Sequence, residues 1–404
     1  MAKKLLVTNG AGDQQVPFLR GVLVQSLVES GLSFEDAYAT AQAVRDQLET
    51  AESTTTKALR ERVATELERR FGAAVRTAYE AGREQDLPII VRTPMREVPF
   101  SVGFLARYLE GCAVEREQAL EGARTVNDVL RKQGRTEIDQ LELRRLVFDA
   151  LSQQSGAPAA NRFLSRCRFD DSGEPLILLV GGATGAGKST VTAELAYLLD
   201  IVRTQSTDMM REIIRCYLMP HVAPTLGYSS FEAWRGLPEV VPLEGQTAVA
   251  DNPVISGFLA QFGTVKVALE ATINRAVQER HHLIVDGIHV LPTKLDLAEA
   301  YRKAVVVSVV LAVTTIERLA KQLARRSEDQ PDRSSSRRID HLGPIWELQT
   351  YMLDQAERGG VRVIANWTLD ETVRKILHEV MARISERCPP DPAALEREMP
   401  TAVP

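Results

Sequence analysis

The residues best suited to chemistry form a glycine-rich segment near the middle of this 404-residue chain. The segment matches the pattern G-x-x-x-x-G-K-[ST] and reads Gly182, Ala183, Thr184, Gly185, Ala186, Gly187, Lys188, Ser189, Thr190. Glycines let the backbone fold into a nest of amide donors around phosphate oxygens, and the lysine reaches the β- and γ-phosphates. The Ser189 hydroxyl is a typical Mg²⁺ ligand. Residues 182–190 therefore predict a site for a nucleoside triphosphate and Mg²⁺.

Two carboxylates stand where phosphoryl transfer needs them. Asp286 ends the apolar segment 283–286 and is predicted to bind Mg²⁺ through water, with a plain turn aspartate as the alternative. Asp208 follows an earlier strand candidate, where a carboxylate can take the proton of a substrate hydroxyl or help hold Mg²⁺. Arg211 lies one helical turn later on the same face and is predicted to act with Asp208. The alternative is a helix-capping aspartate in a local salt bridge.

An arginine-rich segment and one asparagine complete the predicted site. Residues 325–338 carry five arginines and predict a mobile loop between helices that closes over the triphosphate and excludes water. Arg326 and Arg337 are the predicted phosphate contacts, and a solvated loop is the alternative. Asn366 follows the last strand candidate and is predicted to contact the adenine of the nucleotide, although a plain turn asparagine fits nearly as well.

These side chains need a sheet to bring them together. Residues 176–180 form a continuous apolar run, as expected of a strand buried on both faces, and a helix is predicted over 191–199. Helical patterns separate the other strand candidates, which are 202–205, 283–286, 305–313 and 361–365. The pattern predicts an α/β fold with five parallel strands and ligands at their carboxyl ends.

The front of the chain repeats itself. Val98-Pro99-Phe100 repeats Val16-Pro17-Phe18 82 residues later, and the apolar positions that follow match on one helix face. The repeat predicts two mainly helical modules at residues 1–86 and 87–168. Each is expected to begin with a strand pair, 4–7 with 15–18 in the first copy and 88–92 with 98–100 in the second.

The remaining boundaries come from composition. A polar linker is predicted between Cys167 and Pro175, so the nucleotide-binding domain spans residues 174–388. Residues 389–404 contain five prolines and are expected to be an extended or disordered tail.

Charge and cysteine usage narrow the class of protein. The net charge of −5 argues against a nucleic-acid partner. No apolar run reaches about 18 residues, so no membrane partner is expected. The N-terminus lacks the apolar stretch of a secretory signal. Four scattered cysteines without a C-x-x-C pair indicate buried or idle thiols in a cytoplasmic protein.

Residues 174–388 resemble the 2-phosphoglycerate kinase family. The resemblance rests on four segments, which are 181–190, Ser206-Thr207-Asp208, 224–226 with 229–230, and Asp286-Gly287-Ile288-His289-Val290. It implies a P-loop kinase fold and transfer of the γ-phosphoryl group of ATP to the hydroxyl of 2-phosphoglycerate, giving 2,3-bisphosphoglycerate. The family often has Glu-Gly in place of Asp286-Gly287. The alternatives are a kinase of an inositol phosphate or other polyol phosphate, and a nucleotide-sensing regulatory or assembly protein.

The two front modules resemble the ATP-cone, a small regulatory nucleotide-binding domain. ATP-cones usually carry a basic pair before an acidic or glycine turn. The first copy has Val7-Thr8-Asn9-Gly10 there, and the second has Val91-Arg92-Thr93-Pro94, which keeps one arginine. A tandem scaffold for docking or homo-oligomerisation is the alternative.

A small anionic phosphorylated substrate requires a cationic pocket despite the acidic chain. Residues 219–266 are predicted to form a substrate-binding insertion. The cations expected in and around it are His221, Arg235, Lys266, Arg211, Arg215, His289 and Lys294. Trp234 in the same segment is expected to be a core anchor.

Overall fold

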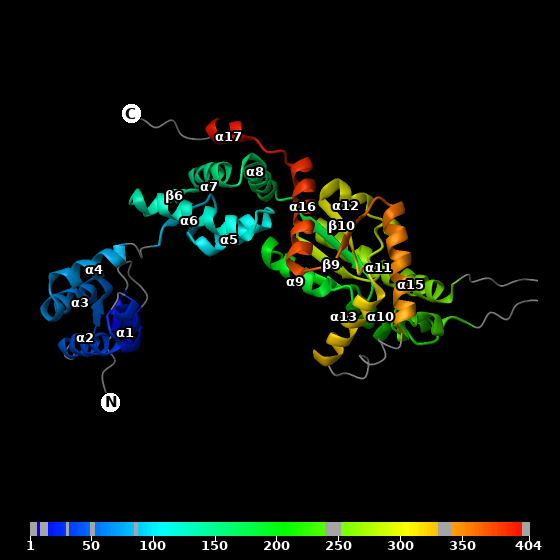
Figure 1. The fold of residues 1–404 in the computed structure, drawn as a ribbon, viewed down its shortest axis with the longest axis horizontal. Coiled ribbons are helices and arrows are strands. Elements are labelled where there is room, and N and C mark those ends of the chain that lie inside the picture. The colour runs from blue at the N-terminus through cyan, green and yellow to red at the C-terminus, as the bar shows by residue number, and fades with distance from the viewer. Residues whose placement is uncertain are drawn as a thin grey trace, which may run out of the picture. The chain divides into compact units, whose positions relative to one another are not determined.

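The computed structural model describes residues 6–8, 15–29, 32–48, 53–84, 88–238, 252–329 and 341–397. The chain divides into two compact units (Figure 1). One is Met1–Phe100 with Leu130–Ile138, and the other is Ser101–Val129 with Asp139–Pro404. The strand residues of the second repeat up to Ile138 therefore fall in the first unit, whereas most of its helical residues belong to the second.

The first repeat is a small sheet with four helices. Its elements are β1 (Leu6–Thr8), β2 (Gln15–Pro17), α1 (Arg20–Glu29), α2 (Phe34–Gln47), β3 (Ser53–Thr55), α3 (Thr56–Phe71) and α4 (Ala73–Glu84). β1 pairs antiparallel with β2 and parallel with β3. Leu27, Val44 and Leu67 pack in the core of this module, from three different helices.

The second repeat has the same order of elements. They are β4 (Ile90–Arg92), β5 (Glu97–Pro99), α5 (Val102–Gly111), α6 (Arg116–Lys132), β6 (Glu137–Asp139), α7 (Gln140–Gln154) and α8 (Ala157–Ser172). The strand order β5-β4-β6 matches β2-β1-β3. The sequence predicted only a strand pair in each copy. β3 and β6 were missed because each is three residues long and ends in the N-cap of a helix, Thr55 or Asp139.

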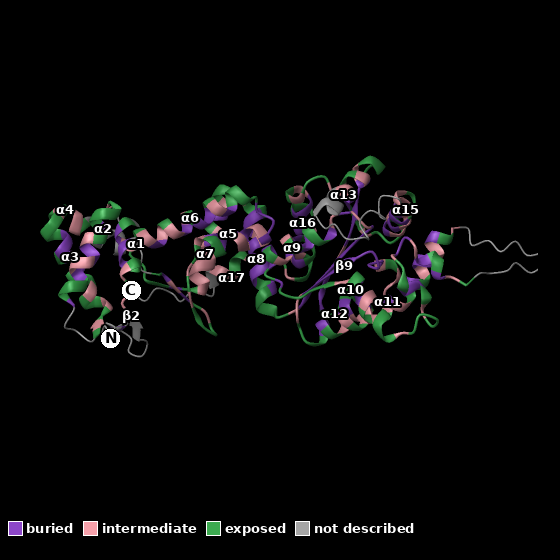
Figure 2. Cartoon of the chain, turned by 90° about the horizontal axis from the view of Figure 1, so that it is seen from below, coloured by how far each residue is buried: buried purple, intermediate pink, exposed green. Residues whose placement is uncertain are grey.

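The second unit contains a five-stranded sheet, and the predicted α/β fold with five parallel strands is confirmed. The strands are β7 (Leu176–Gly182), β8 (Thr204–Ser206), β9 (Leu283–Gly287), β10 (Val305–Ala312) and β11 (Arg362–Ala365). They lie in the order β11-β10-β7-β9-β8. Every residue of β7 and β9 is buried, as a sheet covered on both faces requires (Figure 2).

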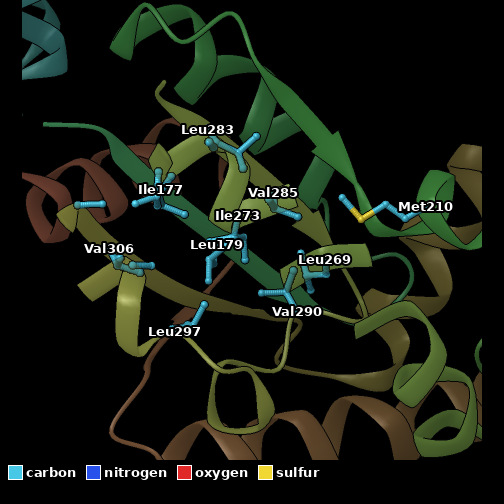
Figure 3. Packing of buried hydrophobic residues seen from close by; sticks show 14 of the residues in the cluster. Ile177, Leu179, Met210, Leu269, Ile273, Leu283, Val285, Val290, Leu297 and Val306 are labelled. Atoms are coloured by element: carbon cyan, nitrogen blue, oxygen red, sulfur yellow. The ribbon is translucent and has the colours of Figure 1, made fainter. Parts of the chain in front are cut away.

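Helices connect and cover these strands. They are α9 (Lys188–Leu199), α10 (Thr207–Tyr217), α11 (Pro253–Gln278), α12 (Ala298–Lys303), α13 (Ile316–Asp329), α15 (Leu342–Arg358) and α16 (Leu369–Arg387). Single 3₁₀ turns occur at η1 (Pro224–Gly227), η2 (Ala233–Gly236) and η3 (Pro292–Lys294). On one side of the sheet Leu269 and Ile273 of α11 pack against Leu179 of β7 and Val285 of β9 (Figure 3).

Helix α11 departs from one sequence expectation. Among the described residues it is long and apolar enough, by length and composition, to be a candidate membrane span. Its residues Phe258, Val265, Leu269 and Ile273 are buried in the unit. These four apolar side chains therefore belong to the core of the unit, and the expected absence of a membrane partner stays a prediction.

Two predicted irregular segments contain helix. The expected linker after Cys167 is helical through Ser172, and α8 ends at Gly173 with a φ of 64°. Only residues 173–175 separate α8 from β7, because Arg166 and Phe169 are buried and keep the helix regular. The expected extended tail includes α17 (Pro392–Arg397), while residues 398–404 lie outside the described chain.

The expectation about the thiols is confirmed for two cysteines. Cys112 and Cys167 are free and buried, whereas Cys216 is exposed and Cys388 half-buried. Burial raises the pKa of the Cys167 thiol to about 12. These two buried thiols therefore act as small apolar side chains.

Candidate nucleotide-binding site

Strand β7 runs directly into the phosphate-binding loop, and three glycines shape that loop. Gly182, Gly185 and Gly187 have φ values of 149°, 85° and 81°, which L side chains rarely adopt. A Cβ on Gly187 would also lie 2.4 Å from Nδ2 of Asn366. The sequence thus places glycine where the backbone must turn and approach another segment, which is the loop shape that would turn amides toward an anion.

Lys188 and Ser189 open helix α9 at the end of this loop. Lys188 is 8% exposed, and its Nζ donates to the carbonyl of Ala183 at 2.9 Å. The side chain therefore lies back across the loop, where a bound phosphate would meet both the ammonium group and the helix N-terminus. Ser189 is exposed at the same helix end.

Ser189 and Asp286 come together from different elements. β9 pairs with β7 so that Asp286 stands opposite Val180, just before the loop. The Ser189 hydroxyl donates to Oδ2 of Asp286 at 3.3 Å, and Asp286 is 7% exposed. A hydroxyl and a carboxylate are the hard oxygen ligands that Mg²⁺ prefers. Within the described residues no cluster of three or more His, Cys, Asp or Glu side chains forms a metal cage. The pair therefore fits an Mg²⁺ ion that also takes nucleotide oxygens.

Asp208 lies at the same edge of the sheet. β8 pairs with β9 so that Ser206 stands opposite Asp286. Ser206 is the N-cap of α10 and accepts from the Asp208 amide, so the Asp208 carboxylate stays exposed in the first turn. A cavity of about 360 Å³ opens here, and its lining includes Ser189, Ser206, Met209 and Asp286.

Arg211 is one helical turn from Asp208, but its guanidinium turns elsewhere. Its Nη1 donates to the carbonyls of Leu226 and Tyr228, each at 2.8 Å, and its Nη2 contacts Glu212. Arg211 thus ties α10 to the segment around η1. Its predicted catalytic role with Asp208 remains a prediction.

Comparison with known proteins identifies the family. The 2-phosphoglycerate kinase of Pyrococcus horikoshii is 33% identical over 289 residues, which are 72% of this chain and 92% of that protein. The same enzyme of Pyrococcus furiosus is 32% identical over 302 residues, 74% of this chain and 95% of that one. The chain belongs to the 2-phosphoglycerate kinase family. The match to the P. horikoshii kinase is longer than the stretch from Glu174 to the C-terminus, so the family also shares part of the chain in front.

Two further comparisons do not identify a family. No protein-family model matches the chain. A shikimate kinase from Acinetobacter baumannii has a TM-score of 0.29 and 16% identity, covering 53% of this chain and 94% of that one. That score is too low to support a structural argument.

The sequence did not predict a buried hydrogen-bond network that joins α10, α11 and the segment around η1. Gln261 of α11 donates from Nε2 to the carbonyls of Thr225 and Tyr228, at 2.7 and 3.0 Å. Its Oε1 must then accept from Nε2 of His289, at 3.0 Å. Nδ1 of His289 therefore accepts from the Thr207 hydroxyl, at 3.1 Å. The network joins the start of α10 to the segment around η1.

His289 corrects the predicted set of cations. Its side chain is fully buried, and this burial lowers its pKa to about 4. It is neutral at neutral pH and supplies no positive charge. The charges of Asp208, Arg211 and Lys188 have smaller effects on its pKa than burial does. The sequence drew attention to His289, three residues after Asp286, but as a cation.

Most of the other predicted cations are already paired. Arg215 bridges to Glu212, Arg235 to Glu232 and Lys266 to Glu270. Acidic neighbours on the same helical turns therefore offset much of the positive charge that the sequence suggested.

The expectation that Trp234 anchors the core is wrong, since this residue is 40% exposed.

Asn366 sits against the phosphate-binding loop. Its Nδ2 donates to the carbonyl of Ala186 at 2.8 Å, and its Oδ1 accepts from the Thr372 hydroxyl at 3.0 Å. Next to it, the Trp367 ring is 48% exposed with the Arg318 guanidinium 4.8 Å from its centroid. Asn366 thus holds the phosphate-binding loop through its side-chain amide. Its predicted contact with adenine stays a prediction.

The predicted arginine lid is described only in part. Residues through Asp329 continue helix α13, so Arg326 belongs to a helix and not to the expected loop. Residues 330–340, which include Arg337, lie outside the described residues.

Proposed function

We propose that this kinase transfers the γ-phosphoryl group of ATP to the hydroxyl of 2-phosphoglycerate, giving 2,3-bisphosphoglycerate. The observation that carries the proposal is the contact of Ser189 with Asp286 beside the Lys188 loop. Relatives that bear the name 2-phosphoglycerate kinase support the choice of acceptor.

The nucleotide side of the site rests on positioning and charge. Loop amides and the N-terminus of α9 face the phosphates, and Lys188 lies where it would neutralise the β- and γ-oxygens. Ser189, and Asp286 through water, would hold Mg²⁺, which supplies further charge neutralisation on the same phosphates.

The acceptor side centres on Asp208. In the proposed reaction its carboxylate takes the proton of the substrate hydroxyl as that oxygen attacks the γ-phosphorus and the bond to the β-phosphate oxygen breaks. Arg211 and Gln261 hold the backbone of residues 225–228 next to α10. That segment, which lies beside the helix that carries Asp208, is the proposed acceptor wall.

Steady-state assays test the proposal. The full chain is incubated with ATP, Mg²⁺ and 2-phosphoglycerate, and ADP and bisphosphoglycerate are measured. Lys188→Ala is expected to abolish turnover, whereas Lys303→Ala, which removes a surface ion pair with Glu299, should keep it. Turnover with an inositol phosphate but not with 2-phosphoglycerate would instead make the protein a polyol phosphate kinase. ATP binding without transfer to any acceptor would favour the nucleotide-sensor alternative.

We propose further that the ATP-cone-like modules serve as scaffolds. Arg92, the one basic residue that the second copy keeps, is paired with Glu97 and Glu137. A phosphate would have to displace both carboxylates. Light scattering with and without ATP tests whether the modules support a homo-oligomer, and an oligomer that forms only with ATP would contradict the scaffold role. We also propose that the protein is located in the cytoplasm.

A further inference from the structure

The C-terminal end of α9 is held by helices of the second repeat. α9 begins at the phosphate-binding loop and ends at Leu199, with Asp200 as a left-handed C-cap. The last four carbonyl groups of a helix have no hydrogen-bond donor within the helix. Here Arg166 of α8 donates from Nη2 to the carbonyl of Leu199 at 3.2 Å. Gly111 of α5 lies directly against the carbonyl of Leu198, and Figure 1 shows α5 and α16 on either side of α9.

The Arg166 side chain is fixed before it reaches the helix. It is 8% exposed, and its Nε donates to Asp170 Oδ1 at 2.9 Å. The Tyr108 hydroxyl donates to the other Asp170 oxygen at 2.7 Å. A buried guanidinium held this tightly aims its remaining donor at one carbonyl.

Arg107 adds a second positive charge at the same helix end. Its Nη2 lies 3.1 Å from Asp200 Oδ1, and its guanidinium lies 5.1 Å from the centroids of both the Phe104 and Tyr197 rings. Positive charge at a helix C-terminus stabilises the helix through its dipole. α9 therefore has two arginines of the module at one end, each paired with an aspartate, and the proposed phosphate site at the other.

Gly111 sets how closely the two helices approach. A Cβ at this position would lie 2.6 Å from the carbonyl oxygen of Leu198, a backbone atom that no side-chain rotation can move. Any larger residue must push α9 away from α5. Gly103 in the same helix offers a matched comparison, since its nearest neighbour would be the Ser101 hydroxyl at 3.9 Å.

We propose that the second module is the seat of the phosphate-binding helix, meaning that its helices fix the position of α9. Arg166 and Gly111 are then positioning residues for the nucleotide. α9 has 12 residues and so spans about 18 Å as one rigid element. A shift at Leu198 and Leu199 therefore displaces Lys188 and Ser189 at its other end. This inference rests on the proposed nucleotide site, and it gives the module a role that needs no nucleotide of its own.

Point variants of the full chain test this seat. Gly111→Ala and Arg166→Met are each expected to raise the Kd for ATP with Mg²⁺ about tenfold by calorimetry, because α9 loses its fixed position. Gly103→Ala should bind as the wild type does. Arg144→Met removes an ion pair with Asp171 in the same module and is the control for destabilisation alone. Arg166→Lys, which keeps the charge, should restore part of the affinity.

The outcomes separate this inference from the proposed function. An unchanged ATP Kd in folded Gly111→Ala overturns the seat, as does an equal change in Gly103→Ala. If Arg166→Met does not fold, Gly111→Ala and Arg166→Lys decide. A purely structural role would lower the melting temperature of Arg166→Met and Arg144→Met while both keep the wild-type Kd. Wild-type protein that binds ATP but phosphorylates no 2-phosphoglycerate refutes the acceptor and leaves the seat testable. Wild-type protein that binds no ATP overturns both.

Discussion

At the residue scale, the site depends on a few groups whose surroundings fix their state. Lys188 lies across the loop, Asp286 is nearly buried next to Ser189, and His289 is held neutral between Thr207 and Gln261. Each residue type was visible in the sequence. The charge state of His289 was not, because burial decided it.

Asp286→Asn tests the metal-binding part of the site. The amide keeps the size of the side chain and loses the negative charge, so we expect kcat to fall about a hundredfold. The Mg²⁺ concentration for half-maximal activity should rise in the same variant. Asp354→Asn, which removes a surface ion pair with Arg358, is the control and should change neither quantity.

The neutral His289 predicts a pH dependence of stability. Its pKa is about 4 in the folded chain and 6.5 without burial. Between these pH values the unfolded chain binds a proton at this side chain and the folded chain does not. Its contribution is complete above pH 6.5 and is lost as the pH falls toward 4, by about 3 kcal/mol in total.

Urea denaturation between pH 4 and 7 measures this effect. The wild type should lose stability over that range relative to His289→Gln, in which the group cannot titrate. His221→Gln removes an exposed histidine and should keep the wild-type slope. Parallel curves for the wild type and His289→Gln would contradict the assignment.

At the element scale, the phosphate loop is held by segments that are distant in sequence. β11 and α16 meet at Asn366, which bonds to Ala186 in the loop and to Thr372 in α16. β9 and β8 bring Asp286 and Ser206 to one sheet edge by parallel pairing. The loop therefore follows the end of β7 and is contacted from the ends of β9 and β11, as expected for a parallel sheet.

Asn366→Ala tests this support. Removing the amide leaves the Ala186 carbonyl without that donor and loosens the loop, so KM for ATP should rise about fivefold. The KM for the acceptor should stay the same. Thr350→Val, which removes a hydroxyl on the surface of α15, is the control. Equal KM values for ATP in Asn366→Ala and the wild type would show that the loop holds its shape without this bond.

At the scale of the whole molecule, the two repeats differ in what they contact. The core cluster of the first copy draws only on residues of that copy. In the second copy, α5 and α8 pack against α9 and α16. Arg387 of α16 also pairs with Glu174 at 2.8 Å, close to the end of α8. Helices α5 and α8 of the second copy are therefore structurally part of the nucleotide-binding unit, whereas its strand residues up to Ile138 belong to the other unit.

Truncation distinguishes the two copies. A chain that begins at Pro88 should keep the ATP affinity and melting temperature of the full protein, because the first copy buries its own core. A chain that begins at Glu174 exposes the faces of α9 and α16 that α5 and α8 cover, and it should melt lower and bind ATP more weakly. Thermal melting and calorimetry check both chains, and equal behaviour of the two would contradict the distinction.

The sequence by itself determined the phosphate-binding segment, the five strands and the repeat. These features are local, since glycine positions, apolar runs and helical periodicity depend on neighbours within a few residues. Even so, local pattern placed a linker over Asp170 and Asp171, where buried neighbours keep α8 helical. It also missed β3 and β6, which carry no apolar run.

Only the tertiary structure decided how these parts act together. The contact of Ser189 with Asp286 joins residues 97 apart, that of Gln261 with His289 joins residues 28 apart, and that of Arg166 with Leu199 joins residues 33 apart. No periodicity encodes such pairs, because each depends on the path of the chain through a packed core. That packing made His289 neutral, turned Arg211 toward backbone carbonyls and placed Gly111 against the end of α9.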